Sequence, residues 1–476
     1  MADKKIPTSI PTDGIYDAKT LGTPKMIILG FQHLFAMFGA TVLVPLLTGL
    51  DVATTLLMAG LGTLLFHLLT KGKVPAFLGS SFAFLGGYAS ITGLAETTGL
   101  SQKELLPYAC VGVFTAGLVY LILAGLIKAF GVKKVMRFFP PIVTGPIIIA
   151  IGLGLSGSAK SNCDANWLIA LLALGIVIAF NIWGKGMCKI IPILLGVLGS
   201  VAVAIILALA CGQPVEVNGE IVIAMFGDAR FQLFKQSALD AFKNAAWVGF
   251  PIVWKETVFG GVDFANHLDL VVSAVIGITP IALATMMEHI GDISAISSTT
   301  KRDFIADPGL HRTLMGDGLA TAMASLFGAP ANTTYGENTG VLALSKVYDP
   351  KVIRIAAVFA AVLSFSPKFA ALINLIPTAV IGGISFILYG MISAIGIRNL
   401  VENRIDFSRS RNLIIAAVIL VCALSGVTIP INGTAQITSL AVASIAGIVL
   451  NIIFPKGDYD TNAKDDEAPK GNTYNV

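Results

Sequence analysis

The sequence predicts an all-α protein that crosses a membrane many times. Of its 476 residues, 55% are apolar and only 13% are charged, and its mean hydropathy is +0.82. A soluble domain needs roughly a quarter of its residues charged to cover its surface. Apolar stretches of about 20 residues, the length of a bilayer-crossing helix, also recur along the whole chain. Composition therefore excludes the disordered, coiled-coil, collagen and disulfide-rich classes.

The two ends of the chain are polar and predict cytoplasmic tails. Residues 1–25 begin with Lys4 and Lys5, and no apolar stretch follows them directly, as a signal peptide would require. Residues 455–476 are equally polar and typical of a disordered tail. The net charge of +4 is small, so it gives no reason to expect nucleic acid as a partner.

Between the tails we expect fourteen transmembrane segments, of which the third and the tenth are short and interrupted by Gly, Ser, Thr or Pro. In order, they are 26–48, 52–70, 74–92, 107–128, 138–157, 165–183, 188–211, 270–297, 312–328, 331–346, 351–367, 370–396, 411–428 and 434–454. Most of the 32 Lys and Arg fall in segments that this map places in the cytoplasm. The positive-inside rule then predicts a multi-pass protein of the plasma or inner membrane with both termini cytoplasmic.

One longer segment, 212–269, is expected outside the membrane on the extracytoplasmic side. From Pro214 onward it alternates polar and apolar residues around Asn218-Gly219, which predicts a small hairpin. Farther on, Trp247 to Phe264 is aromatic and partly apolar, which predicts an interfacial helix.

The two interrupted segments each lie third in a half of seven. An odd number of spans per half places the second half upside down, as in the inverted repeats of many secondary transporters. Pro75-Ala76 opens the third segment and Pro330-Ala331 opens the tenth. Close helix packing is the other interpretation of their small residues. If both helices are broken, their free N–H groups should face one another in a polar pocket near the midplane.

Acidic residues inside the predicted spans are the main functional signal, because a charge at the bilayer centre costs about 3 kcal/mol or more. Glu288 and Asp292 are four residues apart, so they share a face of the eighth span, and Glu337 lies in the tenth. Such neighbours repel one another, so we expect them to share a proton. A structural hydrogen-bond cluster, or a misplaced helix end, is the alternative. There is no HExxH, so we expect no metal, and nothing in the sequence calls for a cofactor. The five cysteines form no CxxC pair and are expected to be packing residues.

Several long strings resemble the nucleobase–cation symporter-2 family. They are Gln32-His33-Leu-Phe-Ala-Met-Phe-Gly-Ala-Thr-Val-Leu-Val-Pro45, Pro75-Ala-Phe-Leu-Gly-Ser-Ser-Phe-Ala-Phe84, Glu288-His-Ile-Gly291, Asp307-Pro-Gly-Leu-His-Arg312 and Asn332-Thr-Thr-Tyr-Gly-Glu-Asn338. The resemblance runs from about Pro24 to Phe454. It implies a core domain of spans 1–4 and 8–11, at 26–128 and 270–367. It implies a gate domain of spans 5–7 and 12–14, at 138–211 and 370–454.

The resemblance also implies a substrate site. In the family's uracil transporters, the residue matching Phe82 packs beside the base and offers its backbone N–H. Those matching Glu288 and Glu337 accept base N–H bonds, with Gly336 close by. The residue matching Tyr389 faces the pocket from the gate, and the one matching His33 lies in the polar network behind it.

The function implied is import of uracil by proton symport through alternating access, with Glu288, Asp292 and His33 in proton coupling. The resemblance also allows a homodimer, and sodium is not excluded as the coupling ion. Asp292 replaces a His of the best-known bacterial uracil member and matches purine-transporting relatives. Xanthine, urate or another purine is therefore an alternative substrate. An anion transporter or channel would want a cationic site, and no nucleophile–base pair suggests an enzyme.

Overall fold

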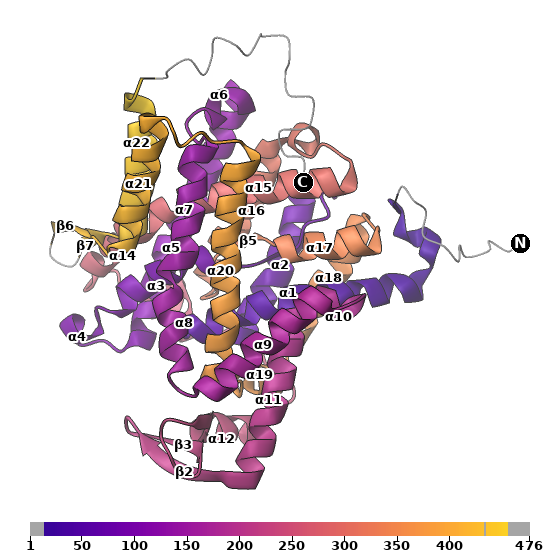
Figure 1. Ribbon diagram of the computed structural model, residues 1–476, viewed down its shortest axis with the longest axis vertical. Helices are drawn as coiled ribbons and strands as arrows, with labels where there is room; N and C mark the ends of the chain where they lie inside the picture. The colour runs from indigo at the N-terminus through magenta and orange to yellow at the C-terminus, as the bar shows by residue number, and fades with distance from the viewer. Residues whose placement is uncertain (1–13, 433–434, 456–476) are drawn as a thin grey trace, which may run out of the picture.

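The computed structural model describes residues 14–432 and 435–455 of a largely helical protein (Figure 1). The expected tails fall mostly on residues 1–13 and 456–476, outside the described part. The helices of the first half are α1 Thr23–Thr48, α2 Val52–Leu69, α3 Leu85–Thr92, α4 Ala95–Thr98, α5 Gln102–Phe130, α6 Val132–Met136, α7 Pro141–Gly154, α8 Ser156–Cys163, α9 Trp167–Trp183, α10 Met187–Ile190 and α11 Pro192–Cys211. The later helices are α12 Gln236–Asn244, α13 Val258–Gly261, α14 Leu268–Ile278, α15 Ala282–Thr300, α16 Leu310–Leu326, α17 Gly336–Ser345, α18 Pro350–Ser364, α19 Pro367–Asn374, α20 Thr378–Glu402, α21 Ser410–Leu424 and α22 Ser439–Ile453.

Seven of the described helical segments are long and apolar enough to cross a bilayer, and α18 with α19 makes an eighth if that pair, bent by 90°, is counted as one. The prediction of a multi-pass membrane protein is thereby confirmed. Three further apolar helices, α9, α21 and α22, have 17 residues or fewer. The count of fourteen spans depends on these shorter helices and stays a prediction.

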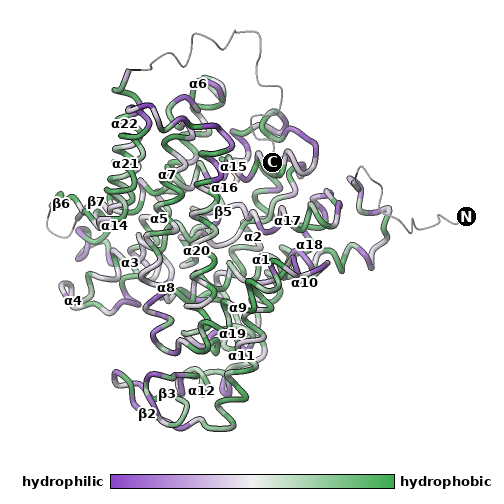
Figure 2. Tube along the Cα trace, in the orientation of Figure 1, coloured by the Kyte–Doolittle hydropathy of each residue, from purple (hydrophilic) through white to green (hydrophobic). Residues whose placement is uncertain are grey.

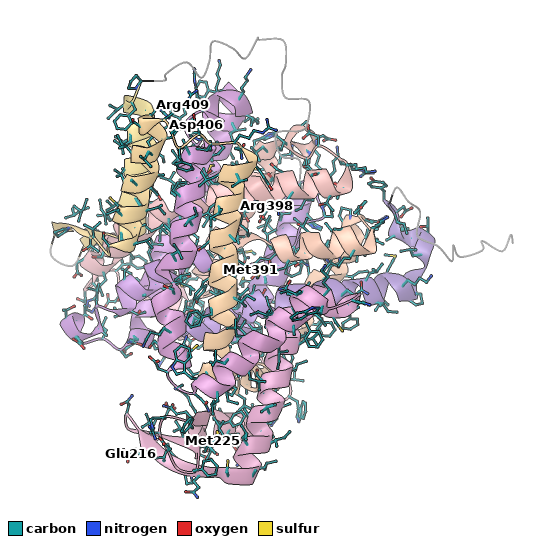
Figure 3. All side chains as sticks on the ribbon, viewed as in Figure 1. Glu216, Met225, Met391, Arg398, Asp406 and Arg409 are labelled. Carbon is teal, nitrogen blue, oxygen red and sulfur yellow. The ribbon has the colours of Figure 1, made fainter. Side chains whose placement is uncertain are left out.

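Polar and apolar residues are separated along the long axis of the molecule. Hydrophobic residues follow the long helices, and hydrophilic stretches gather mainly toward the ends (Figure 2). Asp406 and Arg409 lie at the end opposite to Glu216 and Met225, and Arg398 lies between that end and Met391 (Figure 3).

The two interrupted segments cross each other through a two-stranded antiparallel sheet of β1 (Leu78–Ser80) and β5 (Asn332–Thr334). Gly79 is opposite Thr333 at the centre of the pair. One further backbone bond flanks each strand, from Tyr335 N–H to Phe77 O at 3.0 Å and from Ser81 N–H to Ala331 O at 2.8 Å. A two-fold rotation about the Gly79–Thr333 pair places each strand on the other and each of these two bonds on the other. The crossing is therefore locally two-fold symmetric.

Two threonines from neighbouring helices hold the outer edges of this sheet. The hydroxyl of Thr63 on α2 bonds both the N–H and the carbonyl of Leu78, at 2.9 and 3.1 Å. Thr321 on α16 donates to the carbonyl of Asn332 at 2.6 Å, the equivalent place in the other strand. A short strand inside a bilayer leaves edge groups that need partners, and these hydroxyls supply them.

The extracytoplasmic segment forms a small sheet of β2 (Gly212–Val217), β3 (Glu220–Met225) and β4 (Gln232–Lys235), followed by α12. Asn218 and Gly219 have positive φ angles of 51° and 79°, which confirms the predicted hairpin turn. The interfacial helix expected over 247–264 is wrong, since only the four-residue α13 and a short 3₁₀ turn occur there. Pro251 has no N–H and disfavours helix in the residue before it.

The last two predicted spans are joined by a hairpin of β6 (Ile429–Asn432) and β7 (Ala435–Ile437). The final helix therefore begins at Ser439, later than the expected start at residue 434, which itself lies outside the described residues.

Candidate functional site

Three acidic side chains converge on the crossing of the two broken segments. Glu288 and Asp292 come from α15, and Glu337 is the second residue of α17, which begins directly after β5. All three are half-buried rather than packed away. Their carboxylates are near enough to repel one another, and Asp292 is repelled by both Glu288 and Glu337. The sequence alone placed them in two separate spans, and the crossing brings them together.

Asp292 is tied to the crossing by a hydrogen bond. The hydroxyl of Thr334, the last residue of β5, donates to Asp292 Oδ2 at 2.9 Å. Gly336 follows two residues later and is exposed. A Cβ built at Gly336 would meet only Asp292 Oδ1, at 3.7 Å. The backbone at Gly336 is therefore open to an approaching ligand beside the acids.

The two half-helices begin without side-chain caps. Ser81 precedes the 3₁₀ turn Phe82–Phe84 that leads into α3, and Tyr335 precedes α17, and neither side chain bonds the first turn. The first N–H groups of a helix have no partner within it, and they carry partial positive charge. The site thus offers carboxylate acceptors beside backbone donors, which suits a small molecule that carries both N–H and C=O groups.

Phe82 and Tyr389 meet where the α3 half-helix faces α20. Their ring centroids are 6.1 Å apart with planes at 77°, an edge-to-face contact, and both side chains are buried. The hydroxyls of Tyr389 and Ser385 lie near each other on α20, and neither has a hydrogen-bond partner elsewhere among the described residues. Tyr389 thus closes over Phe82 in this conformation.

His33 lies behind the site rather than in it. The Asn338 side-chain amide donates to His33 Nδ1 at 3.2 Å and to the His33 carbonyl at 3.1 Å. Asn338 directly follows Glu337 on α17. The bond to Nδ1 requires the tautomer that carries the ring proton on Nε2. This geometry ties His33 to α17, and its expected part in proton coupling stays a prediction.

A fourth intramembrane acid, Asp317 on α16, was missed by the sequence reasoning. It is fully buried, and its Oδ2 lies 3.2 Å from His289 Nδ1, which is also fully buried. His289 Nδ1 is in turn 3.4 Å from Thr334 Oγ1. A chain of polar groups therefore runs from Asp292 through Thr334 and His289 to Asp317. Sequence reasoning could have found Asp317, because an acidic residue inside the predicted span 312–328 is the same signal that identified the other three acids.

Tyr335, whose ring could have stacked on a ligand, is used structurally instead. Its hydroxyl donates to the carbonyl of Ser80 at 3.0 Å and accepts a bond from Thr41 at 3.2 Å. Its ring covers Gly79, where a Cβ would lie 2.6 Å from the ring atoms. In the described part of the chain, no group of three or more His, Cys, Asp or Glu side chains is arranged to hold a metal ion.

Comparison with known proteins places the chain in a family. Residues 24–432 match the family model Xan_ur_permease, described as Permease family. The chain is 40% identical to the uracil permease of Bacillus caldolyticus, over 94% of this chain and 95% of that protein. It is 38% identical to the uracil permease of Bacillus subtilis (strain 168), over 94% of this chain and 96% of that protein.

Solved structures of lower sequence identity share the fold. The transmembrane domain of the cyanobacterial bicarbonate transporter BicA matches with a TM-score of 0.60 at 15% identity, over 92% of this chain and 99% of that one. SLC26A9 matches with a TM-score of 0.61 at 13% identity, over 92% of this chain and 66% of that one. The matches in sequence along nearly the whole length show the family: the chain belongs to the nucleobase–cation symporter-2 family of permeases.

Proposed function

We propose that this permease imports uracil together with protons by alternating access. The observation that carries the proposal is the pairing of Glu288 and Glu337 with the uncapped half-helix that starts at Phe82. Uracil is a flat ring with two N–H donors and two carbonyl acceptors. The carboxylates match the donors, the free backbone N–H groups match the acceptors, and the Phe82 ring packs beside the base. The names of the similar Bacillus permeases support the same substrate.

A purine such as xanthine or urate is the second candidate substrate. Asp292 favours it, because purine-transporting relatives of the resembled family carry an acid at this position. The close contact of Phe82 with Tyr389 favours the smaller ring of a pyrimidine, since the two aromatic rings limit the width of the site.

Proton coupling is assigned to the acids of α15. Repulsion among Glu288, Asp292 and Glu337 is relieved when the cluster holds a proton, and a protonated cluster accepts a neutral base without added buried charge. The His289–Asp317 pair extends this polar network away from the substrate. His33 is assigned a positioning role through Asn338.

The proposed architecture has fourteen spans in two inverted halves, divided into the core and gate domains given above. The matched hydrogen bonds of the β1–β5 crossing support the inverted repeat. Packing supports it as well. The ninth span (α16) packs on the fourth (α5), and the second span (α2) packs on the eleventh (α18), which is the equivalent pair when the halves are exchanged. Likewise α21 packs on α22 in the second half, and α9 packs on α11 in the first. Both termini are assigned to the cytoplasm, and a homodimer stays an expectation.

Anion transport is the alternative function with a different class of substrate, because solved structures of anion transporters share the fold. The site itself opposes it. Three half-buried carboxylates at the crossing would repel an anion, and the fold does not determine the chemistry of the site.

A competition assay tests the substrate. Cells that express the chain take up radiolabelled uracil in the presence of excess unlabelled uracil, xanthine, hypoxanthine or cytosine. The proposal expects that only unlabelled uracil reduces uptake strongly. Uptake of radiolabelled uracil no faster than in cells without the chain, together with clear uptake of radiolabelled xanthine, would instead make the chain a purine permease.

A further inference from the structure

A cavity of about 280 Å³ lies away from the acids, between the extracytoplasmic sheet and the membrane helices. Its walls come from the end of α1, from α8, from β3 and β4, and from the α19–α20 junction. In Figure 1 this sheet lies at the lower end of the molecule, where α20 begins. The elements that meet here belong to both the proposed core and the proposed gate.

The lining has the chemistry of a site for a neutral polar molecule. Side-chain amides of Asn162, Gln232 and Asn374 contribute both donors and acceptors, and leucine and isoleucine side chains form apolar walls. Among the described residues of the lining, the charged side chain is Lys235. Its ammonium is paired with Glu220 at 2.9 Å, so it gives the cavity little net charge.

One face of α20 runs from this cavity toward the central site. Ile381 lines the cavity, and Ser385 and Tyr389 follow at intervals of four residues, so the three share a face. The distance from Ile381 to Tyr389 is about 12 Å along the helix axis. Met391, two residues after Tyr389, lies near mid-height of the molecule in Figure 3.

The hydroxyls along this face are unusual for a packed helix surface. Ser385 is fully buried and Tyr389 nearly so, yet beyond each other their hydroxyls have no hydrogen-bond partner among the described residues. A buried polar group without a partner is costly, and a passing polar solute can satisfy it. The route ends at the edge-to-face contact of Tyr389 with Phe82, which closes it in this conformation.

We propose that the amide-lined cavity is an outer waiting site for the nucleobase, joined to the central site by the Ile381–Ser385–Tyr389 face. This rests on the proposed function, because it takes the same substrate. The base binds here weakly through neutral amides, before it meets the carboxylates. The site needs no protonation, so capture at the outer surface is separate from coupling.

Labelling of an introduced cysteine tests for a second site. Asn374→Cys is made in a background with Cys188, Cys211 and Cys422 replaced by Ser, and the rate of its reaction with a thiol reagent is measured in purified protein at increasing uracil. Uracil should slow the reaction, and the half-protecting concentration should be unchanged when Glu337→Gln is added. Asn266→Cys, an exposed outer position away from the cavity, is the matched control and should not respond.

The same experiment separates this inference from the proposed function. If protection is absent, or if its concentration dependence shifts with the Glu337→Gln substitution, the outer site is wrong while uracil transport still stands. If the unsubstituted protein neither binds nor transports uracil, the proposed function itself fails.

Transport kinetics provide an independent test. Asn162→Ala removes one amide from the cavity and should raise the KM of uracil uptake about two- to tenfold, the effect of one lost hydrogen bond. The equilibrium Kd of the central site should stay at its original value, and Asn266→Ala should change neither quantity. An equal rise of KM and Kd, or no change in KM, would contradict a separate outer site.

Discussion

Glu337 is the single residue on which recognition of the base depends most in this proposal. Glu337→Gln keeps the size of the side chain but replaces an acceptor oxygen with an N–H donor. Facing a base N–H, the mismatch should cost about 1–3 kcal/mol, which weakens binding about 5- to 150-fold. Equilibrium binding of uracil to purified protein measures it. Glu96→Gln, at an exposed position on α4, is the control, and unchanged affinity in Glu337→Gln would make Glu337 structural.

Phe82 is predicted to act largely through its backbone. Phe82→Ala should weaken binding through lost ring packing and leave transport measurable. Phe82→Pro should abolish transport, because proline has no N–H, although the first position of a helical turn accepts it sterically. Uptake and the melting temperature are measured for both variants. A normal transport rate in a folded Phe82→Pro variant would remove the backbone donor from the mechanism.

At this scale the sequence predicted which acidic residues lie within the apolar spans better than how the side chains are oriented. Charges inside apolar spans identified Glu288, Asp292 and Glu337, and the same reasoning should have identified Asp317. The orientation of Tyr335 could not be predicted from the sequence, because its ring position depends on Gly79 and Thr41, which are distant along the chain. The pairing of His289 with Asp317 likewise joins two helices that are not adjacent in sequence.

The β1–β5 crossing is the element that assembles the site, and Gly79 allows it to form. In Gly79→Ala, the new Cβ would lie 2.6 Å from the Tyr335 ring and 2.7 Å from Thr41 Oγ1. Overpacking of this kind costs about 1–3 kcal/mol, so we expect a lower melting temperature and weaker uracil binding.

Gly86→Ala is the matched control for that substitution. No atom lies within 4 Å of a Cβ at Gly86, which is in the neighbouring helix α3, so stability and binding should be unchanged or slightly improved. Equal losses in both variants would mean that the effect of Gly79→Ala does not come from the crossing.

The interruptions themselves were predictable, and the sheet between them was not. Gly, Ser, Thr and Pro in the third and tenth segments indicated broken helices. Three-residue strands such as Leu78–Ser80 carry no alternating pattern long enough to detect, and their pairing joins segments far apart in the chain. The expected interfacial helix does not form, because Pro251 disfavours helix in a segment whose aromatic composition alone suggested one.

For the whole molecule, the main question is how substrate movement is coupled to an ion. Asp292→Asn removes one charge from the acid cluster and keeps the side-chain volume. We expect it to reduce uphill accumulation of uracil more than exchange of uracil for uracil, because exchange does not require the proton to cycle. Asp240→Asn, on the exposed helix α12, is the control. Equal losses of accumulation and exchange would place Asp292 in binding rather than coupling.

The class of protein followed from composition alone, because too few charged residues remain to cover a water-facing surface of 476 residues. The inverted arrangement was suggested by the positions of the two broken segments, and the paired hydrogen bonds of Thr63 and Thr321 now support it. The length of each span was less predictable, since helices such as α21 and α22 are shorter than their apolar stretches.

Uptake of radiolabelled uracil by proteoliposomes tests proton-driven uracil transport most directly. The purified protein is reconstituted without sodium, and an inside-alkaline pH gradient is applied, with and without an uncoupler. The proposal predicts uphill accumulation that the uncoupler abolishes and that sodium does not change. Accumulation that survives the uncoupler and requires sodium would contradict proton symport and assign the acids of α15 to a sodium site.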